Sequence, residues 1–362
     1  MAVFEGVKFA DKQMRYLLDG KDYELFEFDD KVYSVSRAIH YGQFLVFEGI
    51  KFFCKKNETG NLEIIFVNWH LNLERLQRSI AFCLGRDQQH LVPQTDEMEN
   101  VVINQFLRDP SMRDFLGEMA ELNAQGYLRP FTYDEELSVG VTFPTMPSVR
   151  AIAFRYERYL GEPFYAAVVP QMVRAVGVNG TGCLKLSSNY VISMKAVDAA
   201  KAILPEATAA LFLDDRPDIP LQERKITEWD SSCCLFVLRS GAVVKIPESP
   251  LILPSVTIQG VVAILKEKGI PVEERDMTYG ELIEKVENKD IVTICSVGTA
   301  GILNRCEKLI LVDYDGKILA THDADKSHEL YRQLGETKTH YWNIFQEKAS
   351  IPAGVRLHKY VL

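Results

Sequence analysis

The sequence predicts a two-domain chain of mixed α+β (α/β mixed) class, and three observations carry this prediction. The chain has 362 residues, more than one hydrophobic core usually holds. Segments with strand and helix periodicity follow one another along the whole chain. They lack the regular strand–helix–strand alternation of a doubly wound sheet. We therefore expect an N-terminal α/β domain over 1–155, a connector over 156–165 and a C-terminal domain over 166–362.

The first domain is expected to combine strands with two helices. Runs rich in β-branched and aromatic residues predict strands over 31–42, 49–56 and 62–68. Apolar residues at helical spacing predict a helix over 71–85, and a second helix is expected over about 98–125. The stretch 144–164 shows few clear elements, so we place the domain boundary there.

The second domain follows the same mixed pattern. Proline, glycine and serine punctuate its periodic segments and so indicate where elements end. The expected elements are a helix over 194–204, a buried strand over 207–215, a hairpin over 233–247 that turns at Ser240-Gly241, a helix over 256–269, a strand over 290–295, a glycine-bearing loop over 296–301 and a helix over about 327–347.

The composition excludes several classes of protein. Lys and Arg total 41 against 50 Asp and Glu, a net charge of −9, which argues against a nucleic-acid partner. No apolar run has the length of a bilayer span, and no secretory signal opens the sequence. Seven scattered cysteines without a CxxC pair predict a reduced, cytoplasmic protein. The seven histidines lie far apart, so no metal site is expected.

Seven separated segments carry the chemistry. They are AIHYGQFLVFEGIKFF, NLERLQRS, GYLRPF, GTGCLKLSSNY, KITEWDSSCCLF, LPSVTIQ and SVGTAG, in this order between residues 38 and 302. Together they resemble the class IV (fold type IV) enzymes that use pyridoxal 5'-phosphate (PLP), and especially the branched-chain amino acid aminotransferases. The resemblance implies a C-terminal PLP-binding domain, PLP at the domain interface and a homodimer.

The resemblance assigns cofactor roles that suit the residue types. Lys185 would form the imine with the PLP aldehyde and shuttle a proton. Tyr190 would hydrogen-bond the phenolic oxygen, and Glu228 would keep the ring nitrogen protonated. The phosphate would be held by Arg75, Val256, Thr257 and Thr299. From the residues alone, a glutamate such as Glu228 is more often a solvated surface carboxylate, and Thr257 could be a helix N-cap.

Substrate contacts also follow from the resemblance. They would come from Tyr41, Phe47, Tyr127, Arg129 and Ala300. The implied reaction moves an amino group between an amino acid and a 2-oxo acid such as 2-oxoglutarate. Alternatives within the class are an aminodeoxychorismate lyase or a D-amino acid transaminase, and a non-catalytic homologue is a third.

The chain departs from the family pattern around these residues. Ser187 and Ser188 replace two glycines after the lysine, and Ser255 replaces a glycine before the phosphate helix. Trp229 and Asp230 follow Glu228, where the family has small residues. Hydroxyl groups near a substrate disfavour a purely apolar side chain, because a desolvated hydroxyl without a partner is costly. These changes favour a specialised amino donor, and Trp229 would narrow the cavity. In the alternative interpretation, Ser188 only caps the next helix and Trp229 faces away from the cavity.

Overall fold

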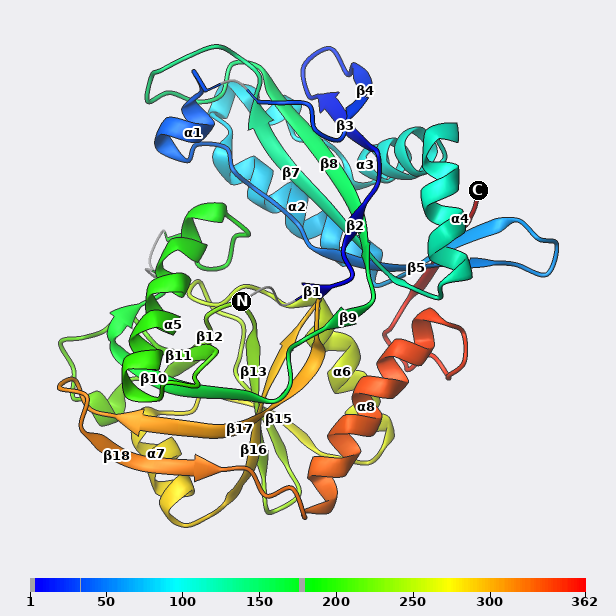
Figure 1. Cartoon of the computed structure of the whole chain (residues 1–362). Helices are drawn as coiled ribbons and strands as arrows, with labels where there is room; N and C mark the ends of the chain where they lie inside the picture. The colour runs from blue at the N-terminus through cyan, green and yellow to red at the C-terminus, as the bar shows by residue number, and fades with distance from the viewer. Residues whose placement is uncertain (1–3, 33, 176–179) are drawn as a thin grey trace. The chain divides into compact units, whose positions relative to one another are not determined.

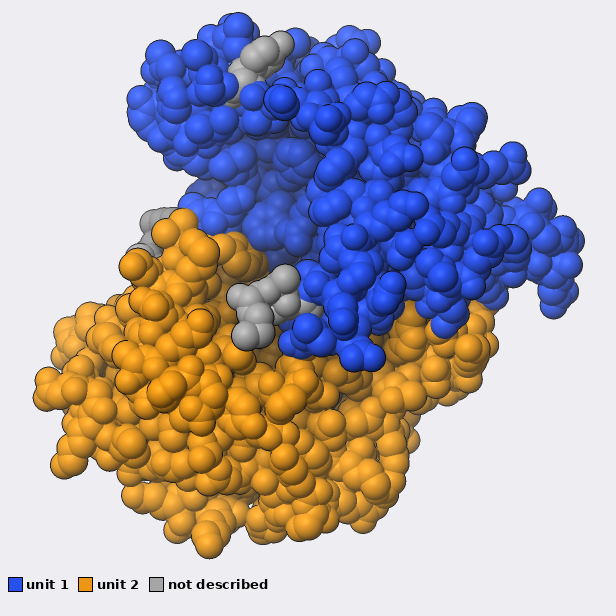
Figure 2. Space-filling model, in the orientation of Figure 1, with its two compact units in different colours: residues 1–160, 184–188, 356–362 blue, residues 161–183, 189–355 orange. Residues whose placement is uncertain are grey.

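The computed structural model describes residues 4–32, 34–175 and 180–362. Contacts divide the chain into two compact units, coloured separately in Figure 2. Unit 1 falls within residues 1–160, 184–188 and 356–362, and unit 2 within 161–183 and 189–355. Each unit combines helices with a large sheet (Figure 1), so the mixed α+β class is confirmed.

Unit 1 is built on an eight-stranded sheet whose neighbouring strands are all antiparallel. Its order is β19-β6-β5-β7-β8-β3-β4, and β2 pairs with β8. A two-stranded pair, β1 with β9, lies outside this sheet. The strands are β1 (Phe4–Glu5), β2 (Lys8–Phe9), β3 (Lys12–Leu17), β4 (Tyr23–Glu27), β5 (Ile50–Lys56), β6 (Leu62–Val67), β7 (Gln125–Asp134), β8 (Pro147–Tyr156), β9 (Arg158–Tyr159) and β19 (Leu357–Val361).

The described residues of unit 1 include four α-helices, of which α4 packs on β5 and β6. They are α1 (Arg37–Tyr41), α2 (Trp69–Cys83), α3 (Thr95–Asn100) and α4 (Arg113–Glu121). A π-helical segment over Val101–Leu107 continues α3. The strands expected over 49–56 and 62–68 and the helix expected over 71–85 are confirmed in β5, β6 and α2.

Three expectations for unit 1 are wrong, each for a local reason. Residues 37–41 form helix α1 instead of a strand, because Ser36 caps its first turn (Oγ accepts the Ala38 N–H, 3.2 Å) and Gly42 ends it at φ 63°. The helix expected over 98–125 is interrupted at Pro110, which cannot continue a helix interior. The stretch 144–164 contains β8, a ten-residue strand buried along almost its whole length.

Unit 2 is built on a nine-stranded sheet of mixed direction, in the order β12-β11-β10-β17-β16-β13-β14-β15, with β18 paired to β17. Strand β10 runs parallel to both β11 and β17, whereas β13, β16 and β17 are antiparallel neighbours. The strands are β10 (Phe164–Val173), β11 (Ala209–Leu213), β12 (Ile226–Trp229), β13 (Cys233–Leu238), β14 (Val243–Lys245), β15 (Val272–Glu274), β16 (Ile291–Gly298), β17 (Ile302–Val312) and β18 (Ile318–Asp323).

The helices of unit 2 cover this sheet. Helix α5 packs on β10 and β11 through a core of alanines, Phe212 and Val169, and α8 packs on β16, β17 and α6. The helices are α5 (Val191–Ile203), α6 (Val256–Glu267), α7 (Tyr279–Glu287) and α8 (Glu329–Phe345). The expected hairpin, the strand within 207–215 and the helices over 194–204, 256–269 and 327–347 are confirmed. Within the described residues, no helix combines the length and apolar character that a bilayer span needs.

Candidate functional site

A short segment around Lys185 joins unit 1 by backbone pairing. The Phe47 N–H donates to the Lys185 carbonyl (3.1 Å) and the Ser187 N–H to the Leu45 carbonyl (2.9 Å). The Lys185 N–H donates to Ser79 Oγ (3.1 Å), and this buried hydroxyl in turn donates to the Arg75 carbonyl on α2 (2.9 Å). Both sides of the lysine backbone are therefore fixed within unit 1.

The Lys185 amine lies in surroundings that disfavour its charge. Its Nζ is 4.7 Å from the centre of the Phe47 ring. Burial, followed by the Arg75 charge, lowers the pKa of Lys185 to about 8, although the nearby Glu48 carboxylate acts in the opposite direction. A larger fraction of this amine is therefore neutral near pH 7 than for an ordinary lysine, and the neutral amine is the nucleophile.

Arg75 is held rigidly by a carboxylate that the motif analysis did not assign. Its Nε and Nη2 contact the two oxygens of Glu48 at 2.6 and 2.7 Å, and both side chains are buried. The Asn72 side-chain amide and the Gly49 N–H also donate to Glu48 Oε2, at 3.2 and 3.3 Å. This bidentate pair fixes the plane of the guanidinium.

The FEG segment and strand β7 together build an aromatic enclosure around Arg129. The Arg129 guanidinium lies 4.8 Å from the Phe47 ring centre and 5.2 Å from that of Tyr127, and it donates to the Tyr127 hydroxyl (3.3 Å). A Cβ on Gly49 would lie 2.0 Å from that hydroxyl, so any larger residue there would force the Tyr127 side chain to shift. Tyr41, by contrast, lies on α1 with half of its surface exposed.

In unit 2, Glu228 is a buried carboxylate on β12, so its interpretation as a surface residue is wrong. Its Oε1 lies 2.7 Å from Arg174 Nη1 and accepts the Leu253 N–H at 3.1 Å. Arg174 follows strand β10, and its guanidinium lies 6.0 Å from the centre of the Tyr190 ring. Arg174 thus connects two residues to which the resemblance gives cofactor roles. The sequence carried no signal for it beyond its residue type.

The two residues after Glu228 are held by contacts within unit 2. Trp229 is buried, donates from its indole nitrogen to the Cys295 carbonyl (3.1 Å) and packs edge-on against Phe164. Its ring therefore packs within unit 2. Asp230 accepts the Ala210 N–H (3.0 Å), and burial raises the pKa of its carboxyl to about 6.

Helix α6 begins where the sequence predicts, but a different residue caps it. Ser255 is the N-cap, and its Oγ accepts the Ile258 N–H (3.3 Å), so the alternative in which Thr257 is the cap is wrong. Val256 and Thr257 are buried in the first turn, where helical N–H groups favour an anion. The Thr257 side chain hydrogen-bonds the buried Tyr341.

The remaining predicted residues lie in turns. Thr299 and Ala300 are half-buried in the turn between β16 and β17. Ser188 is exposed, and α5 begins at Tyr190 without a side-chain cap hydrogen bond. The alternative in which Ser188 caps α5 is therefore wrong.

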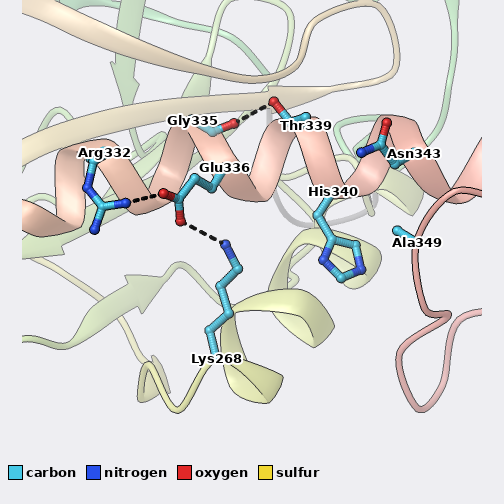
Figure 3. Close-up of a pocket in the computed structure, with 8 residues that line it drawn as sticks. All are labelled: Lys268, Arg332, Gly335, Glu336, Thr339, His340, Asn343 and Ala349. Atoms are coloured by element: carbon cyan, nitrogen blue, oxygen red, sulfur yellow. Dashed lines mark hydrogen bonds and ion pairs between the residues drawn. The ribbon is translucent and has the colours of Figure 1, made fainter.

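One cavity of about 550 Å³ lies elsewhere in unit 2, along α8 (Figure 3). Its charged groups satisfy one another: Glu336 contacts both Arg332 and Lys268. The His340 ring nitrogen contacts the Ser350 carbonyl at 2.9 Å. It contains none of the predicted site residues, which lie in one group around Lys185 in unit 1 and another around Glu228 in unit 2.

Comparisons with known proteins show what the whole chain is similar to. No family model matches the chain. A probable branched-chain-amino-acid aminotransferase of Staphylococcus aureus is 27% identical over 307 residues, 83% of this chain and 78% of that protein. The crystal structure of a branched-chain aminotransferase from Thermoproteus uzoniensis, with norvaline, matches with a TM-score of 0.65 at 22% identity, over 93% of this chain and 96% of that one.

A second solved structure bears on the cofactor. It is the branched-chain amino acid aminotransferase from Thermobaculum terrenum in its PLP form, which matches with a TM-score of 0.63 at 18% identity, over 94% of this chain and 95% of that one. The similarity thus extends along most of the sequence and is not confined to the seven motifs. In sequence and in fold, this chain resembles the branched-chain aminotransferases.

Proposed function

We propose that the protein is a PLP-dependent aminotransferase that moves an amino group between an amino acid and a 2-oxo acid such as 2-oxoglutarate. One observation carries the proposal. Lys185 lies in the matching motif, with its backbone fixed on both sides, and its surroundings lower the pKa of the amine to about 8. A lysine at an ordinary surface position would have neither feature.

The residues present fit PLP. A phosphate needs positive charge and N–H donors. The resemblance gives these roles to Arg75 and to the first turn of α6, and each has the required chemistry. A protonated ring nitrogen needs a carboxylate, and Glu228 is buried with an arginine partner that supports its charge. Thr299 and Tyr190 are proposed to donate to the phosphate and to the phenolic oxygen, as the resemblance implies.

The chain's own groups would divide the chemistry as follows. Bound PLP supplies an aldehyde that condenses with amines and a ring that accepts the electron pair left when the substrate's Cα–H bond breaks. The neutral Lys185 amine would take the proton from the substrate α-carbon. It would return this proton to the carbon that belonged to the PLP aldehyde. Glu228 favours the charged ring nitrogen. Arg129 and Tyr127 bind the substrate carboxylate, and Phe47, Tyr41 and Ala300 contact the rest of the substrate.

We further propose that the chain works as a homodimer. Four apolar side chains between β7 and β8 are more than half exposed, with Val141 the most exposed at 72%; the others are Leu137, Val139 and Phe143. Several exposed apolar side chains in one loop are unusual for a surface that faces only water, and this supports a protein partner at this loop. The seven cysteines are all free, which supports a reducing compartment such as the cytoplasm.

The proposal is tested by trapping the cofactor. The protein is incubated with PLP, reduced with borohydride and mapped by peptide mass spectrometry. We expect the label on Lys185 and none in Lys185→Ala; Lys195→Ala, which removes an exposed lysine of α5, serves as the matched control and keeps the label. Label on another lysine, or none with excess PLP, contradicts the proposal.

A donor screen then distinguishes the members of the class. Amino acids of both hands are offered with 2-oxoglutarate, and the oxo acid product is measured. Turnover of L-amino acids supports the proposal. Turnover confined to D-amino acids, or release of pyruvate from aminodeoxychorismate, identifies one of the alternative enzymes. Cofactor labelling without turnover of any donor points to the non-catalytic homologue.

A further inference from the structure

Arg174 is a buried cation for which the proposed reaction has so far no use. Its side chain is 3% exposed, and that of Glu228, its ion-pair partner, is 2% exposed. The guanidinium Nη1 approaches Glu228 Oε1 to 2.7 Å, and the same cation lies 6.0 Å from the centre of the Tyr190 ring. A cation buried this deeply is costly unless it is paired.

The pair fixes the direction of the Glu228 carboxylate. Two groups from separate parts of unit 2 reach the same oxygen: Arg174, at the end of β10, and the Leu253 N–H, from the loop before α6. A carboxylate offers about four lone-pair positions, so it can hold both groups and still accept a further donor. The anchoring from two sides leaves the carboxylate little rotational freedom.

The pair also determines the charge of the carboxylate. An isolated buried carboxyl group takes up a proton, whereas a cation at 2.7 Å favours the ionised form. Only the ionised form makes a charge-assisted contact with a protonated ring nitrogen, and such contacts are about twice as strong as neutral ones. Removal of Arg174 would therefore weaken recognition of the ring nitrogen in particular.

We propose that Arg174 is a positioning residue that keeps Glu228 ionised and oriented towards the ring nitrogen of the cofactor. This inference rests on the proposed function. Arg174 is then a third residue, after Glu228 and Tyr190, that determines how the cofactor ring is recognised. Arg174 acts through Glu228 and has no proposed contact with the substrate.

The test compares two ligands that differ by one atom. Dissociation constants are measured for PLP and for the analogue in which carbon replaces the ring nitrogen, using full-length apo-protein and fluorescence titration. The parent is expected to prefer PLP by tenfold or more. Arg174→Gln is expected to lose about tenfold of this preference. Arg174→Lys keeps a charge on a differently shaped side chain, so its preference is expected to fall between the two.

A matched control separates positioning from general support. Arg224 is another buried arginine of unit 2, with an ion pair to Asp214. Arg224→Gln is expected to lower the unfolding temperature and to leave the PLP preference unchanged. Equal weakening of both ligands in an Arg174 variant would make its role purely structural and overturn the inference. If Arg174→Gln does not fold, the same criterion is applied to Arg174→Lys.

Failure of the inference and failure of the proposed function give different results. If the parent binds neither ligand and carries no borohydride label on Lys185, the proposed function itself is wrong. If the parent is labelled on Lys185 but the PLP preference is the same in the parent and in both Arg174 variants, only the inference about Arg174 is wrong.

Discussion

Replacement of Lys185 by methionine is expected to stabilise the cofactor-free protein at neutral pH. Methionine has a similar length and carries no charge. The pKa of Lys185 is lowered from 10.5 to about 8, a difference of about 2.5 units. At 1.36 kcal/mol per unit, keeping this lysine charged in the folded state costs about 3 kcal/mol.

The sign of the pH dependence follows from the same values. Below pH 8 the lysine is protonated in both the folded and the unfolded chain, so the full cost is present. Between about pH 8 and 10.5 the folded chain gives up the proton first, and the cost disappears as the pH rises. The stability advantage of Lys185→Met should therefore be greatest at pH 7 and should decrease above pH 8.

Urea unfolding of both proteins, followed by circular dichroism between pH 6 and 10, measures this difference directly. Lys195→Met is the control, because Lys195 is exposed on α5, and its unfolding free energy should follow the parent at every pH. An advantage for Lys185→Met that is absent at pH 7, or that stays constant up to pH 10, would refute the reasoning.

Three further predictions concern the neighbours of this lysine and the second group. Glu48→Gln should lower the Lys185 pKa below about 8 and Arg75→Gln should raise it, because the two charges act in opposite directions. The Lys185 pKa of each variant is measured from the rate of its acetylation against pH by peptide mass spectrometry. Shifts of the two pKa values in the same direction would contradict these opposite roles. Glu228→Gln should keep the fold and lose on the order of a hundredfold in kcat; near-normal turnover would mean that Glu228 is misassigned. Gly49→Ala should displace the Tyr127 hydroxyl and raise KM for the amino donor on the order of tenfold. An unchanged KM would place substrate binding elsewhere.

Local signals in the sequence predicted much of the fold. Helix α6 follows Pro254 and ends before Gly269, at φ 73°, as the punctuation indicates. Helix α1 was misassigned because its Ser36 cap and Gly42 terminator enclose only five residues, too few to establish a periodicity. Strand β8 was missed because Arg150 interrupts its apolar pattern; its guanidinium is buried in a bidentate pair with Glu135.

For the candidate site, the motifs identified residues that carry chemistry but not the residues that support them. Lys185 and Glu228 stand in motifs whose spacing is local. Glu48, Ser79 and Arg174 act through contacts with residues distant in the sequence, and any of the three side chains could stand in an ordinary element. Only their tertiary contacts distinguish these residues from ordinary ones of the same type. The fold, and not the neighbouring sequence, determines which group lies beside a buried polar or charged side chain.

The C-terminal strand β19 has a consequence for synthesis of the protein. It pairs with β6 in register from Leu357 with Val67 to Val361 with Glu63. The ribosome must therefore translate all of unit 2 before unit 1 can complete its sheet. During that interval the edge of β6 presents unpaired backbone groups beside the apolar residues Ile64 and Ile65, a surface prone to aggregation. A nascent chain stalled before residue 357 should bind chaperones more strongly than one that already contains β19.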